Sequence, residues 1–187
     1  RRVLFRSKTF FKLKEFDKSL SNFDYAIKLE SNNPEIYFNK GITLHQLQRY
    51  EEALSNFDYA IKLKFDNPGI YFNKGITLHE LQRYEEALSN FDHAIKLKPD
   101  YSPLYNNKGM TLRELKRYEE ALSNFDYAIK LESNNPGAFL NIGLINLSQG
   151  DFQKGWVLYD YRWKIKDKKK YRHSKFKELD TIKNLRN

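Results

Sequence analysis

Four asparagines recur at one point of a 34-residue pattern, and their side chains are the first candidates for chemistry. Each stands just before a Lys-Gly or Ile-Gly pair: Asn39, Asn73, Asn107 and Asn141. A carboxamide offers both a hydrogen-bond donor and an acceptor. A ladder of such groups could pair with the amide groups of an extended peptide without reading its side chains. The alternative is that these asparagines are solvated or cap neighbouring backbone groups.

Apolar residues flank the four asparagines and would supply contacts to the same ligand. Some of them must belong to the protein core instead. The flanking residues are Phe38, Phe72, Leu140, Ile42, Ile76, Met110 and Leu144.

Three lysines, Lys40, Lys74 and Lys108, follow the asparagines and could form a cationic row for acidic partners. Glu35, Glu80 and Glu114 lie in the same helical segments and would offset that charge. A solvated, neutralised surface is therefore the stronger interpretation of the lysines.

The histidines and glycines do not point to a catalytic or metal site. His45 and His79 are one repeat apart, and no pair among the four histidines has the spacing of metal ligands. The sequence lacks a phosphate-binding glycine loop and an activated nucleophile. We therefore expect no metal, no cofactor and no catalysis from this stretch of chain.

The elements that position these residues come from an internal repeat. RYEEALSNFDYAIK at 49–62 returns as RYEEALSNFDHAIK at 83–96 and unchanged at 117–130. A fixed period of 34 residues indicates one supersecondary unit copied end to end.

Each unit contains two helical patterns. The first runs from Glu35 to Leu47 and begins after Asn33-Pro34, a cap residue followed by proline. The second runs from Tyr50 to about Leu63, and the short turn between them requires an antiparallel hairpin. The sequence therefore predicts an all-α fold, an α-solenoid of antiparallel helix pairs.

Small and aromatic residues repeat on the buried stripes of these helices. Glycine costs about 1 kcal/mol in a helix interior, so glycines at one repeat position imply a close approach by the neighbouring helix. Phenylalanines of the second helices would form a ladder through the core. The glycines are Gly41, Gly75, Gly109 and Gly143, and the phenylalanines are Phe57, Phe91 and Phe125.

Composition narrows the class of protein. The absence of cysteine suits a reducing compartment, and we expect a cytoplasmic location and no membrane span. Of the net charge of +9, most comes from residues 162–187, which hold 11 Lys and Arg against 3 acids. The repeats are close to neutral. A charge run is more often a solvated helix end or linker than a nucleic-acid site, so we do not expect nucleic-acid binding.

The chain divides into seven predicted segments. The first, RRVLFRS, resembles a translated sequencing-library adapter, and we expect it not to be native. The segments are 1–7 (adapter-derived), 8–33 (partial first repeat), 34–67, 68–101 and 102–135 (complete repeats), 136–167 (diverged closing repeat) and 168–187 (basic tail or linker).

Helix pairs of this length, with aromatic, glycine, alanine and phenylalanine in this order, resemble the tetratricopeptide repeat. The resemblance covers about residues 8–165. It implies a right-handed superhelix whose first helices line a concave surface. On that surface the asparagine ladder would resemble the peptide-binding ladder of protein O-GlcNAc transferase.

The last repeat, QGDFQKGWVLYDYRWKIKD at 149–167, departs from the others. It resembles the closing repeat that precedes a glycosyltransferase domain in bacterial proteins, where a basic linker follows. The residues that carry this resemblance are Gly150, Asp151, Phe152, Gly155, Trp156, Tyr159, Arg162 and Trp163.

These observations predict an interaction module that holds an extended peptide in a concave groove and recruits substrates for a larger glycosyltransferase. The alternative is a free-standing scaffold with no attached enzyme. A third possibility is an RNA-associated adaptor that uses the basic tail. The expected partner is a protein or peptide, and the sequence does not indicate an oligomeric state.

Overall fold

The computed structural model describes residues 2–12, 14–64 and 66–165. Within these ranges the secondary structure is helical, without strands, which confirms the predicted all-α solenoid of helix pairs. The helices are α1 (Arg2–Lys12), α2 (Phe16–Leu29), α3 (Pro34–Gln46), α4 (Tyr50–Lys62), α5 (Pro68–Glu80), α6 (Tyr84–Leu97), α7 (Ser102–Glu114), α8 (Tyr118–Leu131), α9 (Pro136–Ser148), α10 (Phe152–Tyr159) and the 3₁₀ helix η1 (Asp160–Lys164).

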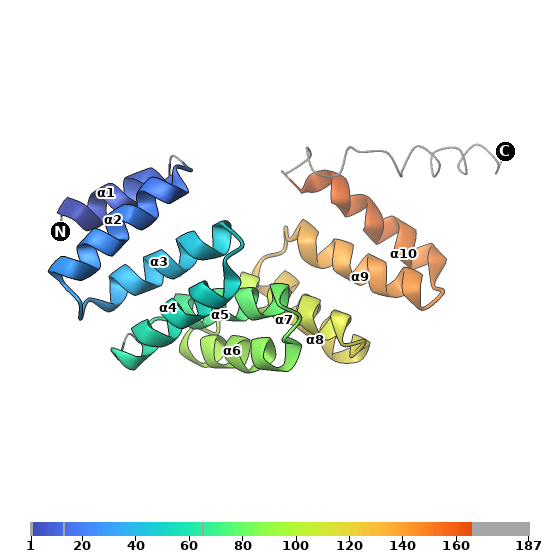
Figure 1. Ribbon diagram of the computed structural model, residues 1–187. Helices are drawn as coiled ribbons and strands as arrows, with labels where there is room; N and C mark the ends of the chain where they lie inside the picture. Colours follow the sequence, from blue (N-terminus) through green and yellow to red (C-terminus); the bar gives the residue numbers. More distant parts are fainter. Residues whose placement is uncertain (1, 13, 65, 166–187) are drawn as a thin grey trace. The chain divides into compact units, whose positions relative to one another are not determined.

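The chain divides into two compact units. Unit 1 comprises residues 1–133 and holds the helix pairs α1–α2, α3–α4, α5–α6 and α7–α8 (Figure 1). Unit 2 comprises residues 134–187, and its described part holds α9, α10 and η1. In the described part of the chain, no helix is both long and apolar enough to cross a membrane.

Asparagine and proline set the start of most first helices. The side chain of Asn33 accepts a hydrogen bond from the backbone N–H of Glu35 at 3.1 Å, and Asn67 accepts one from Gly69 at 2.8 Å. Each cap satisfies a backbone donor that has no partner within the helix, and the following proline needs none. The predicted start at Glu35 is thus within one residue of the observed start.

The core of unit 1 is a row of phenylalanines from the second helices, as the sequence predicted. Phe57, Phe91 and Phe125 have no exposed surface, and Phe23 continues the row in the first pair. A Cβ added at Gly41 would lie 2.5 Å from Cε1 of Phe57. The glycine therefore makes room for a ring and not for a helix backbone, which corrects the expected reason for its presence.

Unit 2 has the close backbone approach that the sequence predicted. A Cβ at Gly143 would lie 2.8 Å from the backbone nitrogen of Tyr159 and 3.0 Å from the carbonyl oxygen of Gly155. Gly155 stands where the earlier repeats have alanine, and a Cβ there would lie 2.7 Å from the side chain of Leu147. Two glycines, one on each helix, thus let α9 and α10 pack more closely.

The first helix pair includes the segment that the sequence suggests is adapter-derived. α1 begins at Arg2, and Ser7 is fully buried at the register position of Gly41. Ser19 Oγ donates a hydrogen bond to the carbonyl oxygen of Ser7 at 3.0 Å. Residues 2–7 thus form a helix in the structure, whereas their origin stays a prediction.

Unit 1 curves with its first helices on the inner side. Consecutive first helices contact one another, α1 with α3, α3 with α5 and α5 with α7. Among the described helices, consecutive second helices make no such direct contact. Elements on the inside of a curved stack lie closer together than those on the outside. The asparagine positions of α3, α5 and α7 therefore belong to the inner layer.

Candidate functional site

The three asparagines of unit 1 hold the same orientation, each fixed by its own helix. Nδ2 donates to the carbonyl oxygen four residues earlier, at 2.6 Å for Asn39, 2.7 Å for Asn73 and 2.8 Å for Asn107. Because that acceptor is a carbonyl, the nitrogen and not the oxygen must face it. Oδ1 and the second N–H are left to face away from that carbonyl. We call these three residues the asparagine face.

The expected alternative, capping of neighbouring backbone, therefore accounts for one of the two amide hydrogens of each residue. All three asparagines are half-buried. Asn141 makes the equivalent bond to Gly137 at 2.9 Å but is 8% exposed and belongs to unit 2. The predicted ladder of four is thus a set of three within unit 1, with Asn141 in a separate unit.

Buried threonines hold the backbone beneath the asparagine face. Thr77 Oγ1 donates to the carbonyl oxygen of Asn73 at 2.8 Å, and Thr43 and Thr111 make the same bond to Asn39 and Asn107. The three threonines have no exposed surface. Each asparagine is therefore anchored through both its side chain and its carbonyl group.

Two histidines extend these bonds from one helix pair to the next. Nδ1 of His45 lies 2.9 Å from Thr77 Oγ1, and Nδ1 of His79 lies 2.9 Å from Thr111 Oγ1. Because each hydroxyl hydrogen is given to an asparagine carbonyl, the threonine oxygen must accept from the ring. The neutral histidines therefore carry their proton on Nδ1.

Burial lowers the pKa of both histidines, since the charged form loses hydration. Glu80 acts in the opposite direction on each ring, and Glu114 also raises the pKa of His79. The charge of Arg113 also lowers the pKa of His79. The sequence indicated neither a metal-binding nor a catalytic role for these histidines, and this bond to threonine was not predicted. The sequence pattern that could have revealed these bonds is a histidine followed 32 residues later by a threonine. It occurs twice, from His45 to Thr77 and from His79 to Thr111.

The apolar flanks are shared between the core and the surface, as expected. The ring of Phe38 lies 6.2 Å from Phe57, and the ring of Phe72 lies 6.2 Å from Phe91 and 5.8 Å from Tyr101. Ile42 and Ile76 also pack against the core while remaining half-buried. Met110 is half-buried, and its sulfur lies 3.7 Å from Nδ2 of Asn106.

One hollow adjoins the asparagine face. It has a volume of about 50 Å³ and is lined by Lys8, Phe11, Phe23, Asn39 and Ile42. Its walls come from α1, α2 and α3. A space of this size admits a small side chain or one or two water molecules.

The lysine row is neutralised by the preceding helix pair. Nζ of Lys40 lies 2.6 Å from Asp24, that of Lys74 lies 2.5 Å from Asp58, and Lys108 and Asp92 repeat the pair at 2.6 Å. Each bond joins a first helix to the second helix before it. The lysines therefore connect helix pairs and do not form a free cationic row.

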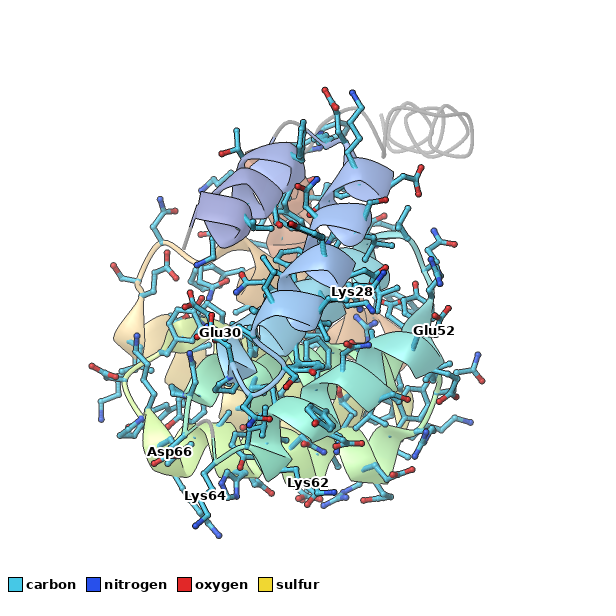
Figure 2. All side chains as sticks on the ribbon, turned by 60° about the vertical axis from the view of Figure 1, so that its left-hand side comes forward. Lys28, Glu30, Glu52, Lys62, Lys64 and Asp66 are labelled. Carbon is cyan, nitrogen blue, oxygen red and sulfur yellow. The ribbon has the colours of Figure 1, made fainter. Side chains whose placement is uncertain are left out.

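Interspersed charges lie at and beyond the C-terminal ends of α2 and α4. Figure 2 shows Lys28 and Glu30 at the end of α2, with Lys62, Lys64 and Asp66 at and beyond the end of α4. All five side chains are exposed. This alternation agrees with the near-neutral balance of the repeats. The basic tail, 168–187, lies outside the described residues.

A second hollow, of about 520 Å³, opens among α6, α7 and α8. The ion pair of Lys108 with Asp92 and a pair of Arg117 with Glu85 at 3.6 Å contribute to its walls. These four charged groups of the lining are thus already paired with one another. In the described part of the chain, no group of three or more His, Cys, Asp or Glu residues is arranged to hold a metal ion.

Solved structures with this fold come from several proteins. MamA from Desulfovibrio magneticus RS-1 superimposes with a TM-score of 0.76 at 19% identity, over 92% of this chain and 96% of that one. YrrB, described as a TPR protein with an unusual peptide-binding site, superimposes with a TM-score of 0.71 at 22% identity, over 88% of this chain and 84% of that one. PilF of Pseudomonas aeruginosa superimposes with a TM-score of 0.75 at 17% identity, over 86% of this chain and 73% of that one. At these identities the likeness establishes the fold alone.

Family models cover most of the helical chain. A model described as TPR repeat matches residues 8–48, 41–82 and 109–150. Models described as tetratricopeptide repeat match residues 68–101 and 90–123. No curated protein matches the chain significantly. The helix pairs and the buried glycine and phenylalanine positions agree with the family-model matches. The chain therefore belongs to the tetratricopeptide repeat family.

Proposed function

We propose that unit 1 is a protein-interaction module that holds an extended peptide along its inner layer of first helices. The observation that carries the proposal is the common orientation of Asn39, Asn73 and Asn107, each fixed by a bond to its own helix. Groups fixed before binding lose little conformational freedom when a ligand arrives.

The chemistry of the asparagine face suits a peptide backbone. Oδ1 can accept from a peptide N–H, and the second amide hydrogen can donate to a peptide carbonyl. Packed helices lie about 8–10 Å apart, and an extended chain advances about 3.3 Å per residue. Each asparagine would therefore meet about every third residue of the ligand. The flanking Phe38, Ile42, Phe72, Ile76 and Met110 would supply apolar contacts for side chains.

The larger context is proposed from the closing repeat. The GDF, GW and RW elements of residues 150–163 resemble the segment before a bacterial glycosyltransferase domain, so the module would recruit substrates for such an enzyme in the cytoplasm. A continuous reading frame after Asn187 that encodes a sugar-nucleotide-binding domain would support this assignment. A stop codon there would favour the alternative, a free-standing scaffold.

Peptide capture tests the asparagine face directly. Peptides of about twelve residues are selected from a random displayed library on the wild-type protein, and their affinities are compared with those for Asn73→Ala/Asn107→Ala. Loss of two amide contacts of about 1 kcal/mol each predicts binding about tenfold weaker or more.

The matched control is Asn56→Ala/Asn90→Ala. Asn56 and Asn90 lie on the second helices, and their Nδ2 atoms also donate to the carbonyl four residues earlier, at 2.8 Å. This variant loses the same helical bonds but keeps the asparagine face, so affinity should hold. Equal affinity of both variants for the selected peptides would remove the proposed role of the face.

A further inference from the structure

The residue directly before the asparagine face differs in kind from one first helix to another. On α3 and α5 it is a half-buried aromatic residue, Phe38 or Phe72. On α7 the same register position holds Asn106, which is also half-buried. Two of the three first helices that carry the asparagine face thus have an apolar flank at this position, and the third has a carboxamide.

Packing explains the phenylalanines but not the asparagine. The rings of Phe38 and Phe72 each lie 6.2 Å from a core phenylalanine of the second helix. Phe125 is the equivalent core residue of the α7–α8 pair, and it has no exposed surface. A carboxamide has no ring to place against it. Asn106 therefore does not repeat the role of Phe38 and Phe72.

The polar groups of Asn106 are poorly satisfied within the protein. Among the described residues, its Oδ1 is buried and has no hydrogen-bond partner. Its Nδ2 lies 3.7 Å from the sulfur of Met110, and a thioether is a weak acceptor. By contrast, Nδ2 of Asn107 donates to the carbonyl oxygen of Pro103 at 2.8 Å. Native proteins seldom leave a buried oxygen unpaired, so the oxygen of Asn106 indicates a place for a ligand group.

We propose that Asn106 selects the peptide side chain that meets α7, and that this side chain carries a hydroxyl or a carboxamide. The proposal rests on the peptide-binding function proposed above. A hydroxyl or a carboxamide can donate to Oδ1 and accept from Nδ2. An apolar side chain at the same place would leave both groups unpaired in a desolvated contact, which costs binding free energy.

Asn106 can reach such a ligand group because its carboxamide is weakly held. In the described part of the chain, the contact of Nδ2 with the Met110 sulfur is the one that would be lost on rotation. The residue as a whole is half-buried, so a change of rotamer can turn the carboxamide toward the inner layer. The ligand then pairs a previously unpaired oxygen without breaking a strong bond in the protein.

The three first helices together predict an ordered pattern in the ligand. Each first helix meets about every third residue of an extended chain. The ligand residues at Phe38 and Phe72 would be apolar, and the ligand residue at Asn106 would carry the hydroxyl or carboxamide. In either chain direction the polar position lies at one end of the motif and not in its middle.

Selection from the random displayed library tests this pattern. Peptides selected on the wild-type protein should share two apolar positions and, about three residues beyond one of them, serine, threonine, asparagine or glutamine. The polar residue of a selected peptide is then replaced by an apolar residue of similar shape, such as valine for threonine or leucine for asparagine. This replacement should weaken binding to the wild-type protein about tenfold.

Asn106→Leu assigns the preference to this residue. It keeps a branched side chain of similar size and removes both polar groups, so the apolar replacement in the peptide should no longer weaken binding. The control, Asn124→Leu, makes the same change on α8, where Nδ2 donates to the carbonyl oxygen of Glu120 at 2.8 Å, and should keep the wild-type preference. Far-UV circular dichroism checks the folding of both variants, and Asn106→Ala takes the place of Asn106→Leu if the latter does not fold.

The outcomes separate this proposal from the one on which it rests. A library that yields no binding peptide would overturn both. Peptides that bind through Asn73 and Asn107 but share no hydroxyl or carboxamide position would overturn only the role of Asn106. An apolar replacement that leaves binding to the wild type unchanged would do the same. So would a replacement that weakens binding to the wild type and to Asn106→Leu equally, because another residue would then recognise the polar group.

Discussion

At the scale of single residues, the inner layer of unit 1 is a chain of hydrogen bonds that runs between repeats. His45 donates to Thr77, and Thr77 donates to the carbonyl of Asn73, whose side chain is fixed one turn back. Each bond in this chain satisfies a group that burial would otherwise leave without a partner. The histidines are thus part of what holds the asparagine face in place.

Protonation of these histidines should weaken the fold. Burial holds the pKa of His45 and His79 below the ordinary value near 6.5. Below about pH 6.5 the unfolded chain binds more protons than the folded one, so the free energy of unfolding decreases as the pH falls. Above about pH 6.5 both states carry neutral histidines, and the free energy of unfolding keeps its full value. Urea unfolding should therefore show a lower midpoint at about pH 5.5 than at about pH 7.5.

The double variant His45→Asn/His79→Asn keeps a side-chain N–H near each threonine and removes the two imidazole groups that become protonated. Its midpoint should change less between the two pH values than that of the wild type. The control is His93→Asn, because His93 is exposed and stacks on Tyr71 with ring centroids 4.0 Å apart. If the double variant and His93→Asn kept the full wild-type pH dependence, the histidine account would be wrong.

At the scale of helices, the turn inside each pair requires a left-handed residue. Gln48, Gln82 and Lys116 have φ of 60°, 59° and 60°, and Gly150 occupies the same place in unit 2 with φ of 85°. Residues with a Cβ are strained in this conformation, whereas glycine adopts it freely. The closing repeat therefore already carries the residue that the turn favours.

Gln48→Gly should raise the free energy of unfolding by about 0.5 to 1 kcal/mol, because relief of strain exceeds the added entropy of the unfolded chain. Thermal unfolding followed by circular dichroism measures the change. Gln48→Ala retains a Cβ and should give no such gain. Equal stability of Gln48→Gly and Gln48→Ala would contradict the strain argument.

The helices were predictable because their signals are local. Asn33 and Pro34 mark a helix start within a few residues, and the spacing of Phe57 and Ala60 marks a buried stripe. The partner of Lys74 was not predictable in this way, since Asp58 lies on the preceding helix pair. Nor was the filling of the space at Gly41 by a ring, which depends on how two helices cross.

At the scale of the whole molecule, unit 1 is held by interactions that each repeat makes with its neighbours. The ion pairs of Lys40, Lys74 and Lys108 join consecutive helix pairs, and so do the histidine bonds to Thr77 and Thr111. In such an array stability is close to a sum of repeat and interface contributions. The same asparagine bond therefore recurs on three consecutive first helices.

Peptide binding at the asparagine face can be observed directly by nuclear magnetic resonance, in a titration that follows the side-chain NH₂ signals. A peptide selected on the wild-type protein is added, and the asparagine signals are assigned by single substitutions. We expect the signals of Asn39, Asn73 and Asn107 to shift, while those of Asn56 and Asn90 on the second helices do not. Shifts confined to the second helices, with the three inner signals unmoved, would contradict it.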